Sequence, residues 1–266
     1  MQVVKSYPDG IFCWVDLATT DPAGAKAFYA ALFGWESEDQ PLEGGGVYTT
    51  LRLGGYRVAG MGEMQAEMQA QGIPSHWSSY VKHDDADGVA ERVAAAGGIL
   101  LFPPMDIMEE GRMLLAQDPT GAVFGVWQPM RHTGAELVNQ PNTLVWNELQ
   151  TRNTAAAQEF YKSVFGWEPQ VDAPSGYVML AADGRRQAGL MQMDESWGDV
   201  PPNWAVYFQV EDVEAYQSRA QELGANILVP VTQAGEMGNF AVIQDPQGAV
   251  FTIMKFNGPS DPPPGY

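Results

Sequence analysis

The sequence predicts an α+β protein built from four βαβββ units, paired into two successive domains whose curved mixed sheets surround a cleft. Two observations predict this fold. The two halves of the 266-residue chain repeat one another. Each half also holds two segments in which a strand pattern is followed by a capped helix and short strands. We expect a first domain at 8–130, a linker at 131–142, a second domain at 143–256 and a disordered tail at 257–266.

The repeat runs along nearly the whole chain. FCWVDLATTDPAGAKAFYAALFGWE at 12–36 aligns without a gap with LVWNELQTRNTAAAQEFYKSVFGWE at 144–168, and DPTGAVF at 118–124 matches DPQGAVF at 245–251. Because aromatic, glycine and acidic residues recur at equivalent places, both halves are expected to share one fold. The stretch between them, RHTGAELVNQPN, is polar and contains proline, which is typical of a linker. The final NGPSDPPPGY is too rich in proline to continue a helix or a central strand.

In the first unit, a β-rich run at 11–18 predicts the opening strand. Asp21 and Pro22 supply an N-cap and a first-turn proline, and Gly34 ends the helix that follows. Two short strands are then expected near 47–53 and 57–63.

The second unit is expected to open with a strand at 76–83. Asp84 and Asp85 cap a helix over 86–96, which Gly97 ends. Short strands are expected near 99–102, 112–117 and 122–128, with a type I turn, Asp-Pro-Thr-Gly, joining the last two.

The chain carries a net charge of −19 and one cysteine, Cys13. A field of that sign repels phosphate backbones, so nucleic acid is not expected as a partner, whereas cationic small molecules are favoured. Cys13 lies between Phe12 and Trp14 in a strand-like run and is expected to be a buried apolar residue. No apolar run approaches the roughly 20 residues of a membrane span, and the polar start does not resemble a signal peptide. The sequence therefore predicts a cytoplasmic protein with no membrane partner.

The four-unit pattern, the LFGWE after the first helix and the DPxGAVF hairpin resemble the glyoxalase/bleomycin resistance protein/extradiol dioxygenase (vicinal oxygen chelate) superfamily. The chain is most similar to the tandem two-domain glyoxalase-like type, with W-x-[DE]-L-x-T in the first strand. This resemblance implies curved sheets with sites on their concave faces. It also implies that enzymatic members hold a divalent metal with His and Glu at four strand positions per site.

None of those four positions carries a metal-binding side chain here. Carried over residue by residue, they fall at Trp14 and Trp146, near Ser78 and Ala205, at Gly125 and Thr252, and near Met61 and Leu190. The three histidines, His76, His83 and His132, are expected at the surface. Because a divalent transition metal needs about three His, Cys or carboxylate ligands, we expect no metal and no cofactor.

Strand alternation indicates what the clefts contain instead. Trp14 and Asp16 share a face, as do Trp146 and Glu148, and flat aromatic rings beside a carboxylate suit a planar or amine-bearing ligand. The candidate ligand-binding residues are Trp14, Asp16, Tyr80, Trp127, Trp146, Glu148 and Tyr207. Alternatively, the two tryptophans fill the cavities that a metal would occupy, and the two carboxylates lie at an edge or on the surface.

These observations predict metal-independent binding of a small aromatic or cationic molecule, of the antibiotic-resistance or sequestration type. One alternative is a glyoxalase-like lyase or isomerase, or a hydroxylase-type enzyme, in which Asp16 or Glu148 is the catalytic general base. Another is a non-catalytic scaffold or signalling protein. The expected partner is a small-molecule ligand, and the chain is expected to be a monomer or a homodimer.

Overall fold

The computed structural model describes residues 2–42, 45–172 and 176–257. The first half contains β1 (Ile11–Thr19), α1 (Pro22–Phe33), β2 (Glu36–Pro41), β3 (Val47–Leu53), β4 (Tyr56–Glu63), α2 (Ala66–Ala70), β5 (His76–Lys82), α3 (Ala86–Ala95), β6 (Ile99–Ile107), β7 (Gly111–Gln117) and β8 (Val123–Pro129). The second half repeats this order with β9 (Leu144–Thr151), α4 (Thr154–Phe165), β10 (Glu168–Val171), β11 (Val178–Ala182), β12 (Arg185–Gln192), the short η1 (Glu195–Trp197), β13 (Asn203–Gln209), α5 (Val213–Glu222), β14 (Asn226–Gln233), β15 (Gly238–Gln244) and β16 (Val250–Phe256). The predicted tail lies outside the described residues, apart from Asn257.

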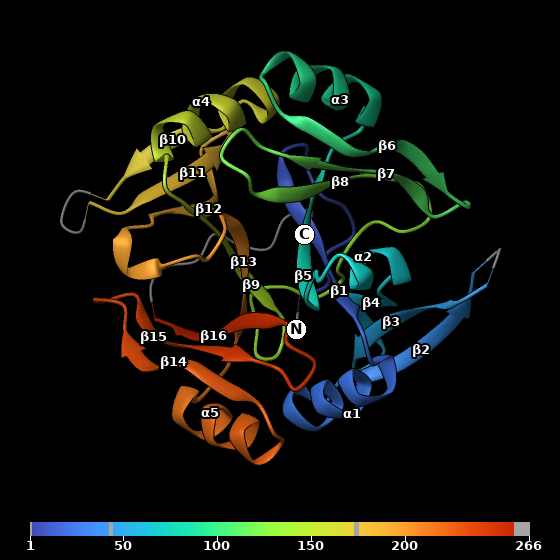
Figure 1. Ribbon diagram of the computed structural model, residues 1–266, viewed down its shortest axis with the longest axis vertical. Coiled ribbons are helices and arrows are strands. Elements are labelled where there is room, and N and C mark those ends of the chain that lie inside the picture. Colours follow the sequence, from blue (N-terminus) through green and yellow to red (C-terminus); the bar gives the residue numbers. More distant parts are fainter. Residues whose placement is uncertain (1, 43–44, 173–175, 258–266) are drawn as a thin grey trace.

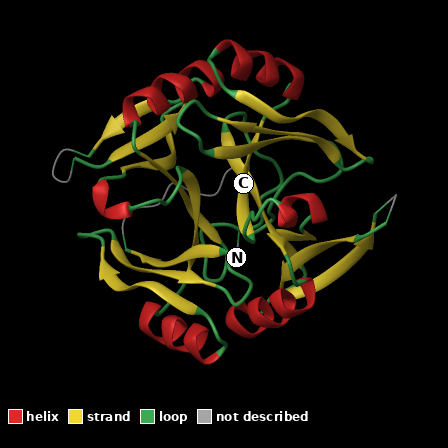
Figure 2. Ribbon diagram, in the orientation of Figure 1, coloured by secondary structure: helices red, strands yellow, loops and turns green. Residues whose placement is uncertain are grey.

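Each half forms one eight-stranded sheet, which confirms the predicted α+β fold. The strand orders, β2-β3-β4-β1-β5-β8-β7-β6 and β10-β11-β12-β9-β13-β16-β15-β14, are equivalent. Two units meet in each sheet where β1 pairs antiparallel with β5, and β9 with β13. Both sheets are curved, and the longer helices lie around the outside of the molecule (Figures 1 and 2).

The helix ends follow the local sequence signals. The Asp21 carboxylate accepts a hydrogen bond from the Gly24 N–H at 3.0 Å, and Asn153 does the same for the Ala156 N–H at 3.1 Å. The chain leaves each of these helices through a glycine with φ near 70°, a conformation that side chains disfavour. The repeated LFGWE motif therefore encodes a helix end and the turn into the next strand.

Two strands of the first half differ from the sequence prediction. Strand β2 is an edge strand whose six residues are all exposed, so its polar sequence shows no alternation from which to predict a strand. Strand β6 continues to Ile107, past Pro103 and Pro104, instead of ending near 102. An edge strand tolerates proline because one side of its backbone makes no ladder hydrogen bonds.

The two halves are joined by two equivalent hydrogen-bonded relays. Trp77 donates to the Tyr29 hydroxyl at 3.1 Å, and that hydroxyl donates to Asp245, in the second half, at 2.8 Å. Helix α1 lies beside α5, and α3 beside α4 (Figure 1), so each half places a helix against the other. The partner relay runs from Trp204 through Tyr161 to Asp118.

The halves therefore share one continuous apolar core. Phe12 of the first half packs against Trp167 and Trp204 of the second, with ring centroids 5.6 and 5.0 Å apart. Among the described helices, none is long and apolar enough to cross a membrane.

Candidate functional site

Strand register places the predicted site residues of the first half on the face of the sheet turned away from α1. Trp14 pairs with Tyr80 and Asp16 with Ser78, and directly paired residues project to the same face. The neighbouring Trp77 projects to the opposite face, where it bonds Tyr29 of α1. The same inner face continues through Gly125, which pairs with Tyr80, and through Trp127 on β8.

In the first half, a tyrosine that was not among the predicted residues completes the site. Trp14 donates its indole N–H to the Tyr48 hydroxyl at 3.0 Å, while the Tyr80 hydroxyl hydrogen-bonds Asp16. Burial raises the pKa of Asp16 to about 7, and the Tyr80 hydrogen bond offsets only part of this shift. Asp16 and Tyr48 remain partly exposed. The first half thus holds a carboxyl group that titrates near neutral pH.

The second half holds an equivalent group of side chains with more hydrogen bonds. Glu148 is 5% exposed and accepts from the Tyr177 hydroxyl at 2.5 Å and the Tyr207 hydroxyl at 2.8 Å, one on each carboxylate oxygen. Trp146 donates to the Tyr177 hydroxyl at 3.3 Å. Burial and the Glu148 charge raise the pKa of both tyrosines, so both hydroxyls keep their protons.

A glycine makes room for the first tyrosine of each site. A Cβ added at Gly60 would lie 1.9 Å from the Tyr48 hydroxyl oxygen, and one added at Gly189 would lie 1.6 Å from that of Tyr177. Gly60 pairs with Asp16, and Gly189 with Glu148. The tyrosine hydroxyls therefore occupy the space into which a side chain from β4 or β12 would extend.

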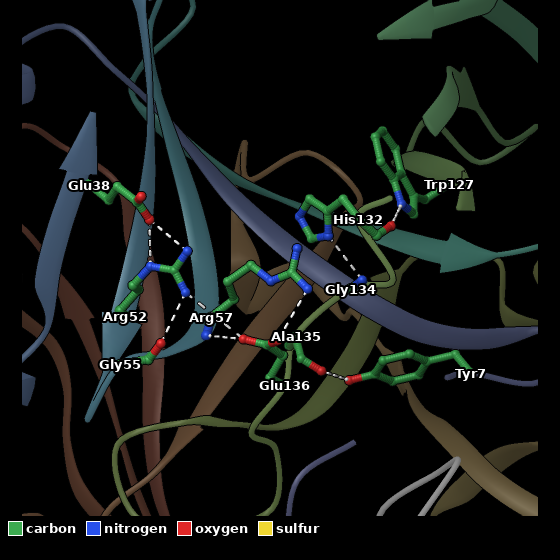
Figure 3. A network of polar contacts seen from close by, with 10 residues as sticks. All are labelled: Tyr7, Glu38, Arg52, Gly55, Arg57, Trp127, His132, Gly134, Ala135 and Glu136. Carbon is green, nitrogen blue, oxygen red and sulfur yellow. Dashed lines mark hydrogen bonds and ion pairs between the residues drawn. The ribbon is translucent and has the colours of Figure 1, made fainter. Parts of the chain in front are cut away.

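The linker covers part of the first site, which corrects the prediction that His132 lies at the surface. The His132 ring stands perpendicular to that of Trp14 with centroids 4.3 Å apart. Trp127 donates its indole N–H to the His132 carbonyl at 2.7 Å (Figure 3). His132 Nδ1 accepts from the Gly134 N–H, and its Nε2 is buried without a hydrogen-bond partner among the described residues. Burial and the nearby Arg57 lower the pKa of His132 to about 3, so the ring is neutral.

Residues 135 and 136 of the linker are held by hydrogen bonds to the first half (Figure 3). Glu136 accepts from the Arg57 backbone N–H at 2.8 Å and from its guanidinium at 3.1 Å, and Tyr7 donates to the Ala135 carbonyl at 2.6 Å. Burial opposes ionisation of Glu136, but these Arg57 contacts outweigh it and lower the pKa of Glu136. As a result Trp14 is only 4% exposed, whereas Trp146 is partly exposed.

The residues on the inner faces do not fit a divalent metal. Within the described ranges, no three His, Cys, Asp or Glu side chains are grouped so that they could hold an ion. The fourth carried-over position, expected near Met61, falls on a glycine, Gly60 or Gly62, because Met61 projects to the other face and lines a hollow of about 390 Å³ beside the start of α1. A glycine has no side chain to bind a metal, and the carboxylates of Asp16 and Glu148 already accept tyrosine hydroxyls.

Comparison with known proteins agrees with this architecture. The family model described as "Glyoxalase/Bleomycin resistance protein/Dioxygenase superfamily" matches residues 11–126 and 128–253. The chain belongs to this superfamily. It is 40% identical to "Putative glyoxylase CFP32" of Mycobacterium bovis, over 94% of this chain and 97% of that protein. It is also 33% identical to "Anthracycline biosynthesis protein DnrV" of Streptomyces peucetius, over 94% of both chains.

Solved structures of superfamily members share the fold at low sequence identity. The Mn(II)-bound glyoxalase from Novosphingobium aromaticivorans has a TM-score of 0.65 at 16% identity, covering 98% of this chain and 85% of that one. The 2,3-dioxygenase LapB from Pseudomonas sp. KL28 has a TM-score of 0.64 at 15% identity, covering 100% and 96%. At these identities the likeness concerns the fold alone.

The structure brings together most of the residues predicted from the sequence and adds three. Trp14, Asp16 and Tyr80 lie together in the first half, as do Trp146, Glu148 and Tyr207 in the second. The sequence reasoning missed Tyr48, Tyr177 and His132. The two tyrosines left a signal, because they recur at equivalent places in the repeat, whereas nothing in the linker sequence indicated that His132 packs on Trp14.

Proposed function

We propose that this superfamily member binds a small planar aromatic or cationic molecule in its clefts without using a metal. One observation carries the proposal: in each half aromatic side chains surround a carboxylate, Asp16 or Glu148, and the described residues include no group of three donors that could hold a metal. Planar rings stack on indole and phenol faces, and a carboxylate in an apolar site pairs with an amine or accepts from a hydroxyl. The relative named for anthracycline biosynthesis supports a planar ligand.

The accessible indole of the second half offers the direct test. Proflavine, a planar cation, is titrated into the native protein by calorimetry, and we expect Trp146→Ala to weaken its binding at least about tenfold. Tyr56→Ala, at an exposed tyrosine where β4 begins, is the matched control and should leave the affinity unchanged. Equal affinity in wild type and Trp146→Ala, or no saturable binding, would contradict the proposed site.

Metal independence needs a separate measurement. Native, untagged protein is assayed for Mn, Fe, Ni and Zn by mass spectrometry, and thermal melting is repeated with each ion added. We expect substoichiometric metal and no increase in melting temperature. Stoichiometric metal, or strong stabilisation by one ion, would show that the donors on the inner faces suffice and would overturn this part of the proposal.

One observation favours a second candidate function, a lyase or isomerase that uses Asp16 as general base. A carboxyl group whose pKa is raised to about 7 is suited to accept a proton at neutral pH. The relative named as a glyoxylase makes a glyoxalase-type substrate the first to test. Turnover should then vanish in Asp16→Asn while the melting temperature stays high, and turnover that survives the substitution excludes this role.

A further inference from the structure

The two clefts differ in how completely their own side chains satisfy the carboxylate. In the second half, Glu148 spans the distance between two tyrosines, and each of its oxygens already accepts a hydroxyl. The amide of Gln150 also lies 3.3 Å from one of those oxygens. Because Glu148 is only 5% exposed and both of its oxygens already accept hydrogen bonds, this carboxylate offers a ligand no free acceptor.

The first half has the same frame with a side chain one methylene shorter. Of the described side chains, Tyr80 alone hydrogen-bonds Asp16. The Tyr48 hydroxyl accepts from Trp14 at 3.0 Å, and no acceptor for its own hydrogen lies among the described residues. Burial and the nearby Asp16 raise the pKa of Tyr48, so the hydroxyl keeps this proton. The first half therefore presents the Tyr48 hydroxyl as a donor and the Asp16 carboxylate as an acceptor for a ligand, and both residues are partly exposed.

The surface next to this pair is apolar. Gly125, which pairs with Tyr80, also pairs with Leu115 on β7, and Leu115 pairs with Phe102 on β6, so the inner face continues as an apolar wall. Phe102 is 37% exposed and Leu115 is partly exposed. A flat apolar body can lie against this wall while its polar edge reaches Asp16 and Tyr48.

We propose that the first half binds a planar molecule whose edge carries a hydrogen-bond acceptor beside a donor, as in a lactam or a hydroxyketone. Tyr48 donates to the acceptor, and Asp16 accepts from the donor. The equivalent cluster in the second half is closed by its own tyrosines and takes no such edge. This inference rests on the proposed function and extends it by naming the hydrogen-bonding edge of the ligand and the half of the protein that binds it.

The experiment uses 2-quinolone, whose lactam N–H and carbonyl lie side by side, and N-methyl-2-quinolone, which lacks the donor. Calorimetry on the full chain should show one 2-quinolone site, with N-methyl-2-quinolone at least about tenfold weaker. Tyr48→Phe should weaken 2-quinolone binding about tenfold. The matched Tyr177→Phe should leave it unchanged, and thermal melting should show that both variants are folded.

A second variant tests whether the shorter side chain of Asp16, by one methylene, keeps this site open. Asp16→Glu should let the carboxylate reach Tyr48 as Glu148 reaches Tyr177, and this should abolish 2-quinolone binding. Equal binding of the two quinolones, or full affinity in Tyr48→Phe or in Asp16→Glu, would overturn the inference, as would absence of 2-quinolone binding to the wild type. If proflavine still binds in a Trp146-dependent way, the proposed function survives that outcome, whereas loss of both ligands overturns both.

Discussion

In the first half the carboxylate Asp16 is partly exposed and the adjacent Trp14 is 4% exposed, whereas in the second half Glu148 is 5% exposed and the adjacent Trp146 is partly exposed. Two features of the sequence produce this reversal. The linker places His132 against Trp14. The longer Glu148 side chain accepts a hydrogen bond from Tyr177, whereas Asp16 accepts none from the equivalent Tyr48. The repeat has kept the frame of aromatic rings while the polar groups that each half offers have diverged.

The largest difference between the halves should appear when the carboxylates are removed. Glu148→Ala removes the acceptor of the buried Tyr207 hydroxyl and of the partly exposed Tyr177 hydroxyl and should lower the free energy of unfolding by about 2–4 kcal/mol. Asp16→Ala removes a carboxyl group that is costly to bury and should cost less than about 1 kcal/mol at pH 8. Urea unfolding of both variants measures this, and equal losses would show that the two clusters are equally bonded.

Substitution of the glycines next to Tyr177 and Tyr48 should again destabilise the second half more than the first. Gly189→Ala forces a Cβ against Tyr177, which Glu148 and Trp146 hold in place, and should cost about 2–3 kcal/mol of unfolding free energy. Gly60→Ala meets Tyr48, which among the described side chains hydrogen-bonds only Trp14, so the ring can move and the cost should be about 1 kcal/mol. A larger loss for Gly60→Ala in thermal melting would contradict the view that Tyr48 is the freer side chain.

The fold and the direction of the predicted side chains could be read from the sequence because they depend on local and repeated signals. The caps at Asp21 and Asn153 are set by a few neighbouring residues, and the two-residue period of a strand puts Trp14 and Asp16 on one face. Edge strand β2 escaped prediction because an exposed strand needs no apolar alternation.

The contacts that distinguish the halves are not local, and this is why the sequence did not reveal them. Whether a carboxylate reaches a tyrosine on another strand depends on strand register and on about one carbon–carbon bond of length. The position of His132 depends on how the linker crosses the sheet, where the Gly134 backbone passes so close to Cys13 that an added Cβ would lie 2.6 Å from its carbonyl oxygen. Composition and spacing carry no record of either distance.

The titration of Asp16 should make the free energy of unfolding depend on pH, and Asp16→Asn should remove this dependence. Its folded pKa is raised to about 7, while the exposed group in the unfolded chain ionises near 3.9. The contribution of neutral Asp16 to the free energy of unfolding is fully present below about pH 4 and is lost as the pH rises to about 7. Asp16→Asn should therefore match wild type at pH 4 and exceed it by about 1–3 kcal/mol at pH 8. Urea unfolding across this range tests it, and a constant difference would show that Asp16 does not titrate as a buried group.

His132 should act in the opposite direction within the same half. Its folded pKa is lowered to about 3, below its ordinary 6.5, so its contribution is complete above about pH 6.5 and is lost as pH falls toward 3. His132→Phe keeps a ring against Trp14 and cannot take up a proton. Wild type should lose about 1–2 kcal/mol more than the variant between pH 7 and pH 4.5. Parallel stability curves would mean that the linker ring is solvated.

The smallest difference is expected where the halves remain equivalent, at the relays that join them. Tyr29→Phe and Tyr161→Phe each remove one hydroxyl between a tryptophan N–H and an aspartate. Both aspartates keep backbone donors in their turns, such as the Ala249 N–H for Asp245 and the Gly121 N–H for Asp118. Each variant should therefore cost about 1–2 kcal/mol, with the two losses equal within about 0.5 kcal/mol. Urea unfolding measures both losses, as it does for Glu148→Ala and Asp16→Ala. Equal losses would show that the two halves differ in their clefts and not in the shared core. Unequal losses would show that they differ in the shared core as well.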